Sequence, residues 1–266
     1  MTAFYKLRAF IIHGFQMAWS YKLNFVARYI SGLVSVVMFY FLDAFVGSGN
    51  HQIPGGDYFA FVLIGGAFSR YMELAMRSFS LNLRDQMLMG TIEPLVSTAI
   101  SMPLALLGPS TWTMLEGTIL VGLQLVFGAA LGADFSQANW PAVILVATLG
   151  VLSVMCYGVF SAAFTIVFKS ADPINWLIAS TAYVFSGVFF PVSIMPAWLR
   201  VISYLLPFTY VLRALRGALL EGASLAALRT DILSLLGFTL VLFPLALWSM
   251  GWAVRHLKQS GKLAHY

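Results

Sequence analysis

The chain has 266 residues, of which 60% are hydrophobic and 9% charged, whereas about a quarter of the residues of a soluble protein are charged. Its mean hydropathy of +0.87 excludes a soluble globular domain and indicates an integral membrane protein. The formal net charge of +5 could attract nucleic acid, but the basic residues cluster beside apolar segments and form no free basic stripe, so we expect no nucleic-acid partner.

The first 22 residues are predicted to form an amphipathic helix in the membrane interface, ahead of a transmembrane domain over residues 23–266. Apolar residues recur at helical spacing along one face, and Lys6, His13 and Gln16 lie away from it. Because His13 and Gln16 interrupt the apolar stretch, it differs from a cleavable signal peptide, and we expect it to be retained. The alternative is an irregular cytoplasmic lead-in. The apolar face consists of Phe4, Leu7, Ile11 and Phe15.

Six further apolar runs are long enough to cross a bilayer, and we expect each to be a helix. They are apolar on all sides and rich in Leu, Ala, Val and Phe, whereas a β-barrel would show strands of alternating polarity. Between Ser101 and Phe168 the only charged residues are Glu116 and Asp134. The sequence therefore predicts an all-α integral membrane protein with six transmembrane helices. The predicted spans are 24–47, 58–80, 103–131, 141–168, 173–190 and 230–254.

Lysines and arginines are distributed unevenly among the connections between these spans. They gather before the first span and after the second, fourth and last, whereas residues 48–57 and 132–140 contain none. Since basic residues favour the cytoplasmic side, both termini are predicted to be cytoplasmic, which requires an even number of spans. Four arginines break this rule because they fall on the predicted outer side, namely Arg200, Arg213, Arg216 and Arg229.

The cytoplasmic connection after the second span, at about 82–93, is short and amphipathic. Leu81 to Leu88 is expected to continue a helix that Gly90 ends, and Glu93-Pro94 is expected to start another. A surface helix of this kind offers a contact for a soluble partner, although a plain connector would have the same composition.

The arginines on the predicted outer side belong to a segment, 191–222, that is too apolar for a loop and too broken for a span. Three prolines in it each lack a backbone donor and end or kink a helix. We therefore predict a re-entrant helical hairpin between spans five and six, made of two short helices that dip into the outer leaflet. Arg213 and Arg216 would turn away from the apolar face and reach lipid headgroups. The prolines are Pro191, Pro196 and Pro207.

Four charged residues fall within or near the ends of predicted spans, where an ionised group is costly and usually faces a partner or a wet cavity. Arg70, Glu73 and Arg77 are spaced by three and four residues, so they can pair along one helix face. Glu116 on the third span could complete their neutralisation. The alternative is that span two continues into the cytoplasm, where water solvates these groups. The candidates for a substrate path are Asp43, Arg70, Glu73 and Glu116.

Three phenylalanines stand at the end of the fifth span, beside the predicted hairpin. An apolar constriction there could close a path by excluding water. The candidate gate residues are Phe185, Phe189 and Phe190.

Four short motifs follow one another along the chain. They are Gly90-Thr91-Ile92-Glu93-Pro94-Leu95, Phe185-Ser186-Gly187 with Phe190-Pro191, Met195-Pro196-Ala197-Trp198-Leu199-Arg200, and Leu206-Pro207-Phe208-Thr209-Tyr210 with Ala214-Leu215-Arg216. In order and spacing these motifs resemble those of the type-2 ATP-binding-cassette (ABC-2) exporter permeases, and the resemblance covers nearly the whole chain.

The resemblance implies a pair of six-helix permease subunits, joined by two cytoplasmic ATPase subunits, in the inner membrane of a bacterium or archaeon. It implies a coupling helix at about 82–93 against the ATPase, which would itself bind ATP and Mg²⁺. This chain contains no G-x-x-x-x-G-K-[ST] loop to hold phosphates, so we expect it to bind no cofactor or metal. The residues assigned to the ATPase contact are Asn82, Arg84, Asp85, Gln86 and Glu93.

A long apolar path with few charges favours an exporter of a lipidic or amphiphilic substrate, and the permeases it resembles export drugs, lipids and lipid-linked glycans. A proton-coupled secondary transporter is the main alternative, and it would use buried carboxylates. An intramembrane enzyme is a third alternative, but the four histidines lie at chain ends or in loops and no Gly-x-Ser-x-Gly pattern occurs. We therefore predict a transport subunit and not an enzyme.

Overall fold

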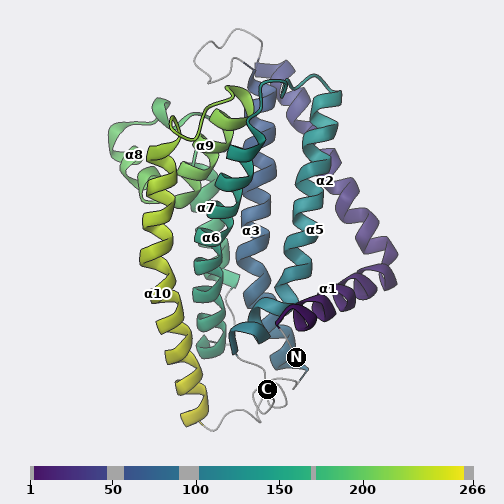
Figure 1. The fold of residues 1–266 in the computed structure, drawn as a ribbon, viewed down its shortest axis with the longest axis vertical. Coiled ribbons are helices and arrows are strands. Elements are labelled where there is room, and N and C mark those ends of the chain that lie inside the picture. Colours follow the sequence, from purple (N-terminus) through teal and green to yellow (C-terminus); the bar gives the residue numbers. More distant parts are fainter. Residues whose placement is uncertain (1–2, 47–56, 90–101, 169–171, 261–266) are drawn as a thin grey trace.

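The structure, a computed structural model, describes residues 3–46, 57–89, 102–168 and 172–260, and these ranges contain helices and no strand. The long helices stand side by side, α1 lies across their lower end, and α8 and α9 lie near the upper end (Figure 1). The elements are α1 (Ala3–Ser20), α2 (Lys22–Val46), α3 (Tyr58–Leu88), α5 (Met102–Ala130), α6 (Trp140–Phe168), α7 (Asp172–Phe185), the 3-10 helix η1 (Val192–Ile194), α8 (Ala197–Tyr204), α9 (Pro207–Leu220) and α10 (Arg229–Ser260).

Within the part of the chain that the structure describes, five helices are long and apolar enough to cross a membrane, and each overlaps a predicted span. The chain is therefore a multi-pass membrane protein. The fifth predicted span, 173–190, corresponds to α7, whose 14 residues reach only about 21 Å against a hydrocarbon core of about 30 Å. Gly187 follows with a φ of 78°, the left-handed conformation that commonly ends a helix. The count of six spans stays a prediction. The five helices are Lys22–Val46, Tyr58–Leu88, Gly108–Ala130, Trp140–Phe168 and Arg229–His256.

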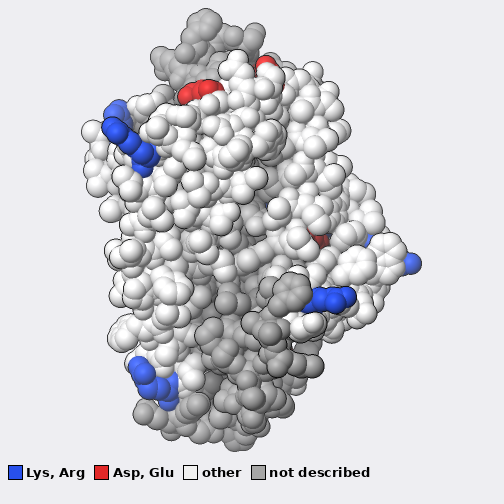
Figure 2. Space-filling view, in the orientation of Figure 1, with Lys and Arg blue, Asp and Glu red and all other residues white. Residues whose placement is uncertain are grey.

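The surface agrees with a membrane setting. Figure 2 shows charged side chains toward the upper and lower ends of one face, with a mostly uncharged surface between them that carries a recessed acidic patch and basic atoms beside it at the right-hand edge. The outer faces of α2 and α10 expose large apolar side chains, of which Phe45 is 89% and Leu240 is 77% exposed. Surfaces of this kind need lipid or another protein chain to cover them.

Each of the three prolines after α7 stands at the start of a helix, whereas the sequence predicted that they end or kink one. Pro191 precedes η1, Pro196 precedes α8, and Pro207 is the first residue of α9. Proline suits these positions because the first N–H groups of a helix have no partner within the helix. Two α-helices, α8 and α9, and the 3-10 helix η1 therefore lie between α7 and α10, and their re-entry into the bilayer stays a prediction.

α3 is the central helix and packs against α5, α6 and α9. Its residues 59–69 are all buried. The predicted second span ended at residue 80, but the helix continues without interruption to Leu88, so the expected helical continuation is confirmed. Its 31 residues extend over about 46 Å, more than a bilayer core requires. The predicted end at Gly90 and the predicted restart at Glu93 lie outside the described residues.

Glycines allow the other helices to approach α3 closely. A Cβ atom at Gly158 of α6 would lie 2.5 Å from the Phe79 ring and 2.9 Å from the Met76 carbonyl oxygen. A Cβ atom at Gly128 of α5 would lie closer still to Leu63 Cδ2, whereas Gly132 follows the helix with a φ of 116° and has nothing near its Cβ position. Such contacts draw α5 and α6 onto α3, as small residues do in membrane helix pairs.

We predict that Gly158→Ala destabilises the protein by about 1–3 kcal/mol, because the added methyl group forces α6 away from the α3 backbone. Gly122→Ala on α5 is the matched control, since nothing lies within 4 Å of its Cβ position. The measurement is the midpoint of thermal unfolding in detergent. A midpoint for Gly158→Ala equal to that of the control would contradict the close packing.

Candidate functional site

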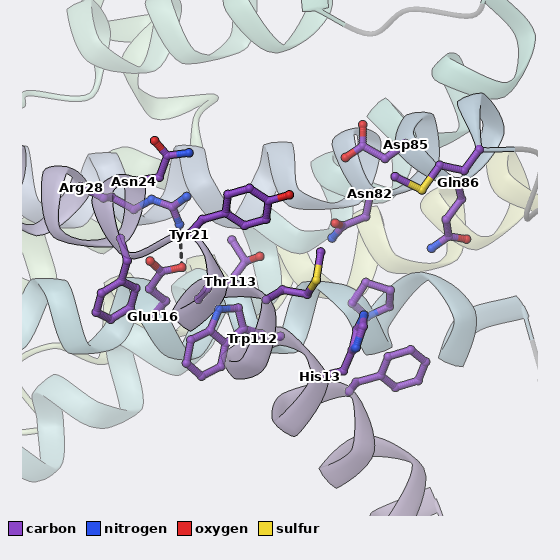
Figure 3. Close-up of a pocket in the computed structure, with 17 residues that line it drawn as sticks. His13, Tyr21, Asn24, Arg28, Asn82, Asp85, Gln86, Trp112, Thr113 and Glu116 are labelled. Atoms are coloured by element: carbon purple, nitrogen blue, oxygen red, sulfur yellow. Dashed lines mark hydrogen bonds and ion pairs between the residues drawn. The ribbon is translucent and has the colours of Figure 1, made fainter.

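A pocket of about 540 Å³ opens between α1, α2, the C-terminal end of α3 and the first turns of α5. We call it the α1 pocket. Figure 3 shows Arg28 and Glu116 on one side of it and Asn82, Asp85 and Gln86 on the other. Three residues assigned to the ATPase contact line it, together with one residue assigned to the substrate path, Glu116.

α1 forms one wall of the pocket because it packs closely on α5. Gly14 lies directly against Trp112, and Gly108 lies against Phe10, so neither glycine has room for a side chain. Phe15 adds an edge-to-face contact with Trp112, with ring centroids 5.6 Å apart. The predicted N-terminal helix is therefore confirmed as a helix, and its place in the membrane interface stays a prediction.

An ion pair lines one side of the pocket. Arg28 Nη1 on α2 donates to Glu116 Oε2 on α5 at 2.6 Å. Glu116 is only 4% exposed, and its other oxygen, Oε1, has no hydrogen-bond partner among the described residues. We expected Glu116 to neutralise the charges of α3, and this is wrong because Arg28, 88 residues away along the chain, satisfies it instead.

The charges of α3 are satisfied separately. Glu73 and Arg77 form the predicted pair along the helix, with Glu73 Oε1 and Arg77 Nη1 3.2 Å apart. Arg70 Nη2 donates to Ser31 Oγ of α2 at 3.4 Å. Asp43 lies toward the other end of α2. The four candidate path residues are therefore not brought together at one site.

Three of the five residues assigned to the ATPase contact line the α1 pocket. Asn82 Nδ2 donates to Ser110 Oγ of α5 at 3.1 Å, and Asp85 and Gln86 follow on the next turn of α3. Arg84 is half-buried outside the pocket lining. Glu93 lies outside the described residues.

Sequence reasoning missed the share of α2 in the pocket. Asn24 and Arg28 of α2 line it, together with Tyr21, which directly precedes the helix. Their spacing of three and four residues places them on one helix face. A polar face at the start of an apolar span was the available signal.

At the opposite end of α3, Arg216 of α9 is buried and 6% exposed. Its Nη1 donates to the carbonyl of Gly187 at 2.7 Å, and its Nη2 donates to those of Val188 at 2.9 Å and Phe61 at 3.0 Å. The guanidinium also lies 3.4 Å from the centre of the Phe61 ring. The prediction that Arg216 reaches lipid headgroups is wrong, because backbone carbonyls of α3 and of the turn after α7 bind its side chain.

Gly65 makes this arrangement possible. A Cβ atom at Gly65 would lie 2.5 Å from Arg216 Nη2. Only a residue without a side chain lets a guanidinium lie this close to the surface of α3.

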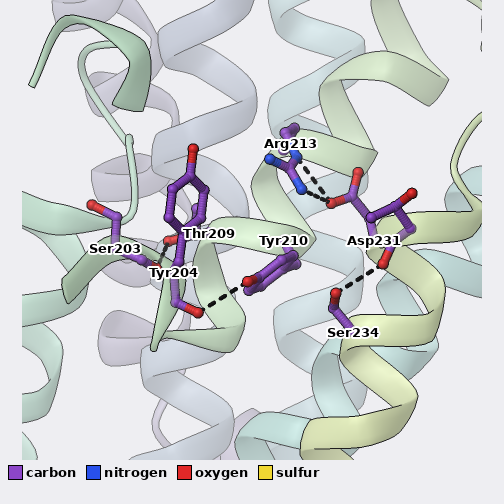
Figure 4. Close-up of polar contacts among 8 residues, drawn as sticks. Ser203, Tyr204, Thr209, Tyr210, Arg213, Asp231 and Ser234 are labelled. Atoms are coloured by element: carbon purple, nitrogen blue, oxygen red, sulfur yellow. Dashed lines mark hydrogen bonds and ion pairs between the residues drawn. The ribbon is translucent and has the colours of Figure 1, made fainter. Parts of the chain in front are cut away.

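Arg213 ties α9 to α10. Its Nε donates to Asp231 Oδ1 at 2.9 Å and its Nη2 donates to the same oxygen (Figure 4). The turn between α8 and α9 is held by Thr209 Oγ1, which donates to the Ser203 carbonyl at 2.6 Å, and by Tyr210 Oη, which donates to the Tyr204 carbonyl at 3.0 Å. Arg213 therefore pairs within the protein, contrary to the headgroup contact expected from the sequence.

The candidate gate residues lie at the end of α7 and in the turn after it. Phe189 is 37% exposed and stacks on Tyr183, with ring centroids 6.4 Å apart. Its carbonyl accepts a hydrogen bond from Tyr58 Oη at 3.2 Å. Phe185 and Phe190 are half-buried. A gating role for these three rings stays a prediction.

Comparison with known proteins gives one family. A family model described as ABC-2 type transporter matches residues 5–220, which is most of the chain, from α1 to the end of α9. No curated protein matches the chain.

We predict that Arg216→Lys destabilises the protein by about 1–3 kcal/mol, because an ammonium cannot reach three separate carbonyls and leaves buried acceptors unpaired. Arg213→Lys is the matched control, since Arg213 is half-exposed and lysine can keep an ion pair with Asp231; its effect should be about 0–1 kcal/mol. Thermal unfolding in detergent measures both. Equal losses of stability would show that Arg216 has no special role.

Proposed function

We propose that this chain, which belongs to the ABC-2 type transporter family, is the permease of an ATP-driven exporter for a lipidic or amphiphilic substrate. The chain is a transmembrane component of an ABC transporter. What we propose beyond this is that transport is outward, that the substrate is lipidic or amphiphilic, and that ATP hydrolysis supplies the energy. In this proposal two separate ATPase subunits bind ATP and Mg²⁺, and a second copy of the permease completes the path.

One observation carries the proposal: α3 runs unbroken from the Arg216 contact at one end of the protein to the α1 pocket at the other. No proline interrupts it. Its adjacent glycines are both packed, because Gly65 lies under Arg216 and Gly66 lies against the Phe39 ring. A helix without a kink site moves as a rigid element. A push on its Asn82–Leu88 end would therefore reach the segment between α7 and α10.

We propose that the Leu88 end of α3 faces the cytoplasm. The beginning of α1 and the end of α10 lie at this same end of the molecule (Figure 1), so both termini would be cytoplasmic. ATP binding would draw the ATPase subunits together and shift the equilibrium between two arrangements of the permease. The residues that contact the ATPase would be Asn82, Arg84, Asp85, Gln86 and Glu93. The protein would lie in the inner membrane of a bacterium or archaeon.

The pairing of buried charges favours ATP-driven transport over proton coupling. Among the described carboxylates, Glu116 and Asp231 are the buried ones, and each has an arginine partner. A carboxylate that carries protons must lose and regain its charge during the cycle. A fixed arginine at hydrogen-bond distance opposes that change, because it favours the ionised form.

We predict that an ATPase subunit with a G-x-x-x-x-G-K-[ST] loop co-purifies with the chain from native membranes, and that Asp85→Lys lowers its affinity about tenfold or more. Asp85 is exposed at the C-terminal end of α3, so the reversed charge should repel the partner without disturbing the core. Glu221→Lys, exposed after α9 at the opposite end, is the control and should retain the ATPase.

The ratio of ATPase to permease after purification is the measurement. Retention of the ATPase by Asp85→Lys would remove Asp85 from the contact. Transport by the purified chain alone, in vesicles without ATP, would contradict the whole proposal.

A further inference from the structure

Arg70 of α3 is a cation that no carboxylate neutralises among the described residues. Its Nη2 donates to the hydroxyl of Ser31 on α2 at 3.4 Å. A hydroxyl carries no charge, and none of the ion pairs within the described ranges includes Arg70. The side chain is half-buried, so part of its surface stays open to a ligand. Arg70 can therefore bind an anion that comes from outside the chain.

The position of Arg70 along α3 is deep in the predicted membrane region. Near Trp112, α5 packs against α1, which is predicted to lie in the membrane interface, and Asn82 of α3 donates to Ser110 in the same part of α5. Asn82 therefore lies near the level of α1. Arg70 precedes it by 12 residues, or about 18 Å of helix, whereas half of a hydrocarbon core is about 15 Å. A charge at such a depth usually faces a partner or a water-filled path.

Arg70 belongs to a charged face of α3 that its neighbours leave open. Spacing by three and four residues places its members on one side of the helix, and all are partly exposed. Beside one end, α2 contacts Arg70 and then slants away from α3 toward the lower end of the molecule (Figure 1). Beside the other end, Asn175 of α7 donates to Ser80 Oγ at 2.9 Å. The charged face of α3 consists of Arg70, Glu73 and Arg77.

The charged face carries a net positive charge. Glu73 and Arg77 neutralise one another, because Glu73 Oε1 and Arg77 Nη1 lie 3.2 Å apart. The charge of Arg70 is left over. A second copy of the permease that meets this face would bring the same excess of positive charge, so the two faces would repel one another unless an anion lay between them.

We propose that Arg70 binds the anionic headgroup of an exported amphiphile, a phosphate or a carboxylate, on the charged face of α3. A guanidinium suits such a group because two of its N–H donors can bind two oxygens at once. The hydrocarbon chain would lie along α2, where Ile30 and Val34 are exposed next to Ser31. This inference rests on the proposed function, since it names the headgroup charge of the cargo.

The test is photoaffinity labelling of the full chain in phosphatidylcholine nanodiscs, without an ATPase. The probe is a dodecyl phosphate with a diazirine in its chain, and the matched probe is the corresponding dodecyl alcohol. We expect the phosphate to label residues of α2, α3 and α7 near the charged face saturably, with competition by unlabelled dodecyl phosphate. Mass spectrometry locates the label. Equal labelling of these residues by the alcohol would overturn the proposal.

Arg70→Gln should raise the dodecyl phosphate concentration needed for half-saturation about tenfold or more, because it removes the charge and keeps an N–H donor for Ser31. Arg200→Gln is the matched control. Arg200 is also half-buried and donates to a neutral acceptor, the carbonyl of Met195 at 2.7 Å, but it lies in α8. The control should leave labelling unchanged. An unchanged half-saturation in Arg70→Gln would contradict the proposal.

Ser31→Asp provides a second variant if Arg70→Gln does not fold. Ser31 is exposed, so the substitution should be tolerated, and the new carboxylate would neutralise Arg70 from within the protein. Labelling by dodecyl phosphate should then weaken, whereas Ser31→Asn, which adds no charge, should retain it. Equal labelling of these two variants would count against an anion site at Arg70.

Nanodiscs that contain phosphatidylglycerol distinguish an exported amphiphile from a resident anionic lipid. Full labelling in them supports an exported amphiphile, and loss of labelling would overturn that assignment in favour of a membrane lipid bound at Arg70. Because no ATPase is present, failure of the labelling test leaves the exporter proposal standing, and failure of ATPase co-purification leaves the anion site standing.

Discussion

The arrangement of this protein depends on how the buried guanidinium of Arg216 is satisfied. A helix that ends inside an apolar environment leaves carbonyl groups without donors, and lipid offers none. Arg216 donates to the carbonyls of Gly187 and Val188 beyond the end of α7, and to that of Phe61 within α3. The same side chain therefore lets α7 stop short, holds the following turn, and fixes α9 against the central helix. A lysine or a neutral residue at this position could not join all three segments.

From its contact with Arg216, α3 runs through the protein to the α1 pocket. Its buried first half is covered by α5, α6 and α9, and its last turns form a wall of the α1 pocket. There the Arg28–Glu116 pair joins α2 to α5, as Arg216 joins α9 to α3 at the other end. Each end of the molecule thus has one arginine bound to buried acceptors: Arg216 contacts α3 itself, and Arg28 contacts Glu116 of the neighbouring α5. This gives a physical basis for a movement at one end to change the packing at the other.

The spans could be read from the sequence because a bilayer demands long apolar helices, and five of the predicted runs are such helices. The length of α7 could not be read in this way, because the run stays apolar beyond Phe185 while Gly187 turns the backbone. The partner of Glu116 was missed because Arg28 lies on a different helix, and spacing along one helix says nothing about contacts between helices. Arg216 was mispredicted because its neighbours in the sequence resemble a lipid-facing surface. The adjacent Gly65 and Gly66 of α3 were the available signal that another helix packs closely at this point.

The most direct measurement is the accessibility of two engineered cysteines in a background in which Cys156 is replaced by serine. Asp85→Cys probes the pocket end of α3, and Glu221→Cys probes the segment after α9. In right-side-out vesicles a membrane-impermeant maleimide should modify the thiol at position 221 and leave that at position 85 unmodified, and inside-out vesicles should give the reverse. Modification of both thiols from the same side would contradict a central helix that links an ATPase-facing end to an outer end.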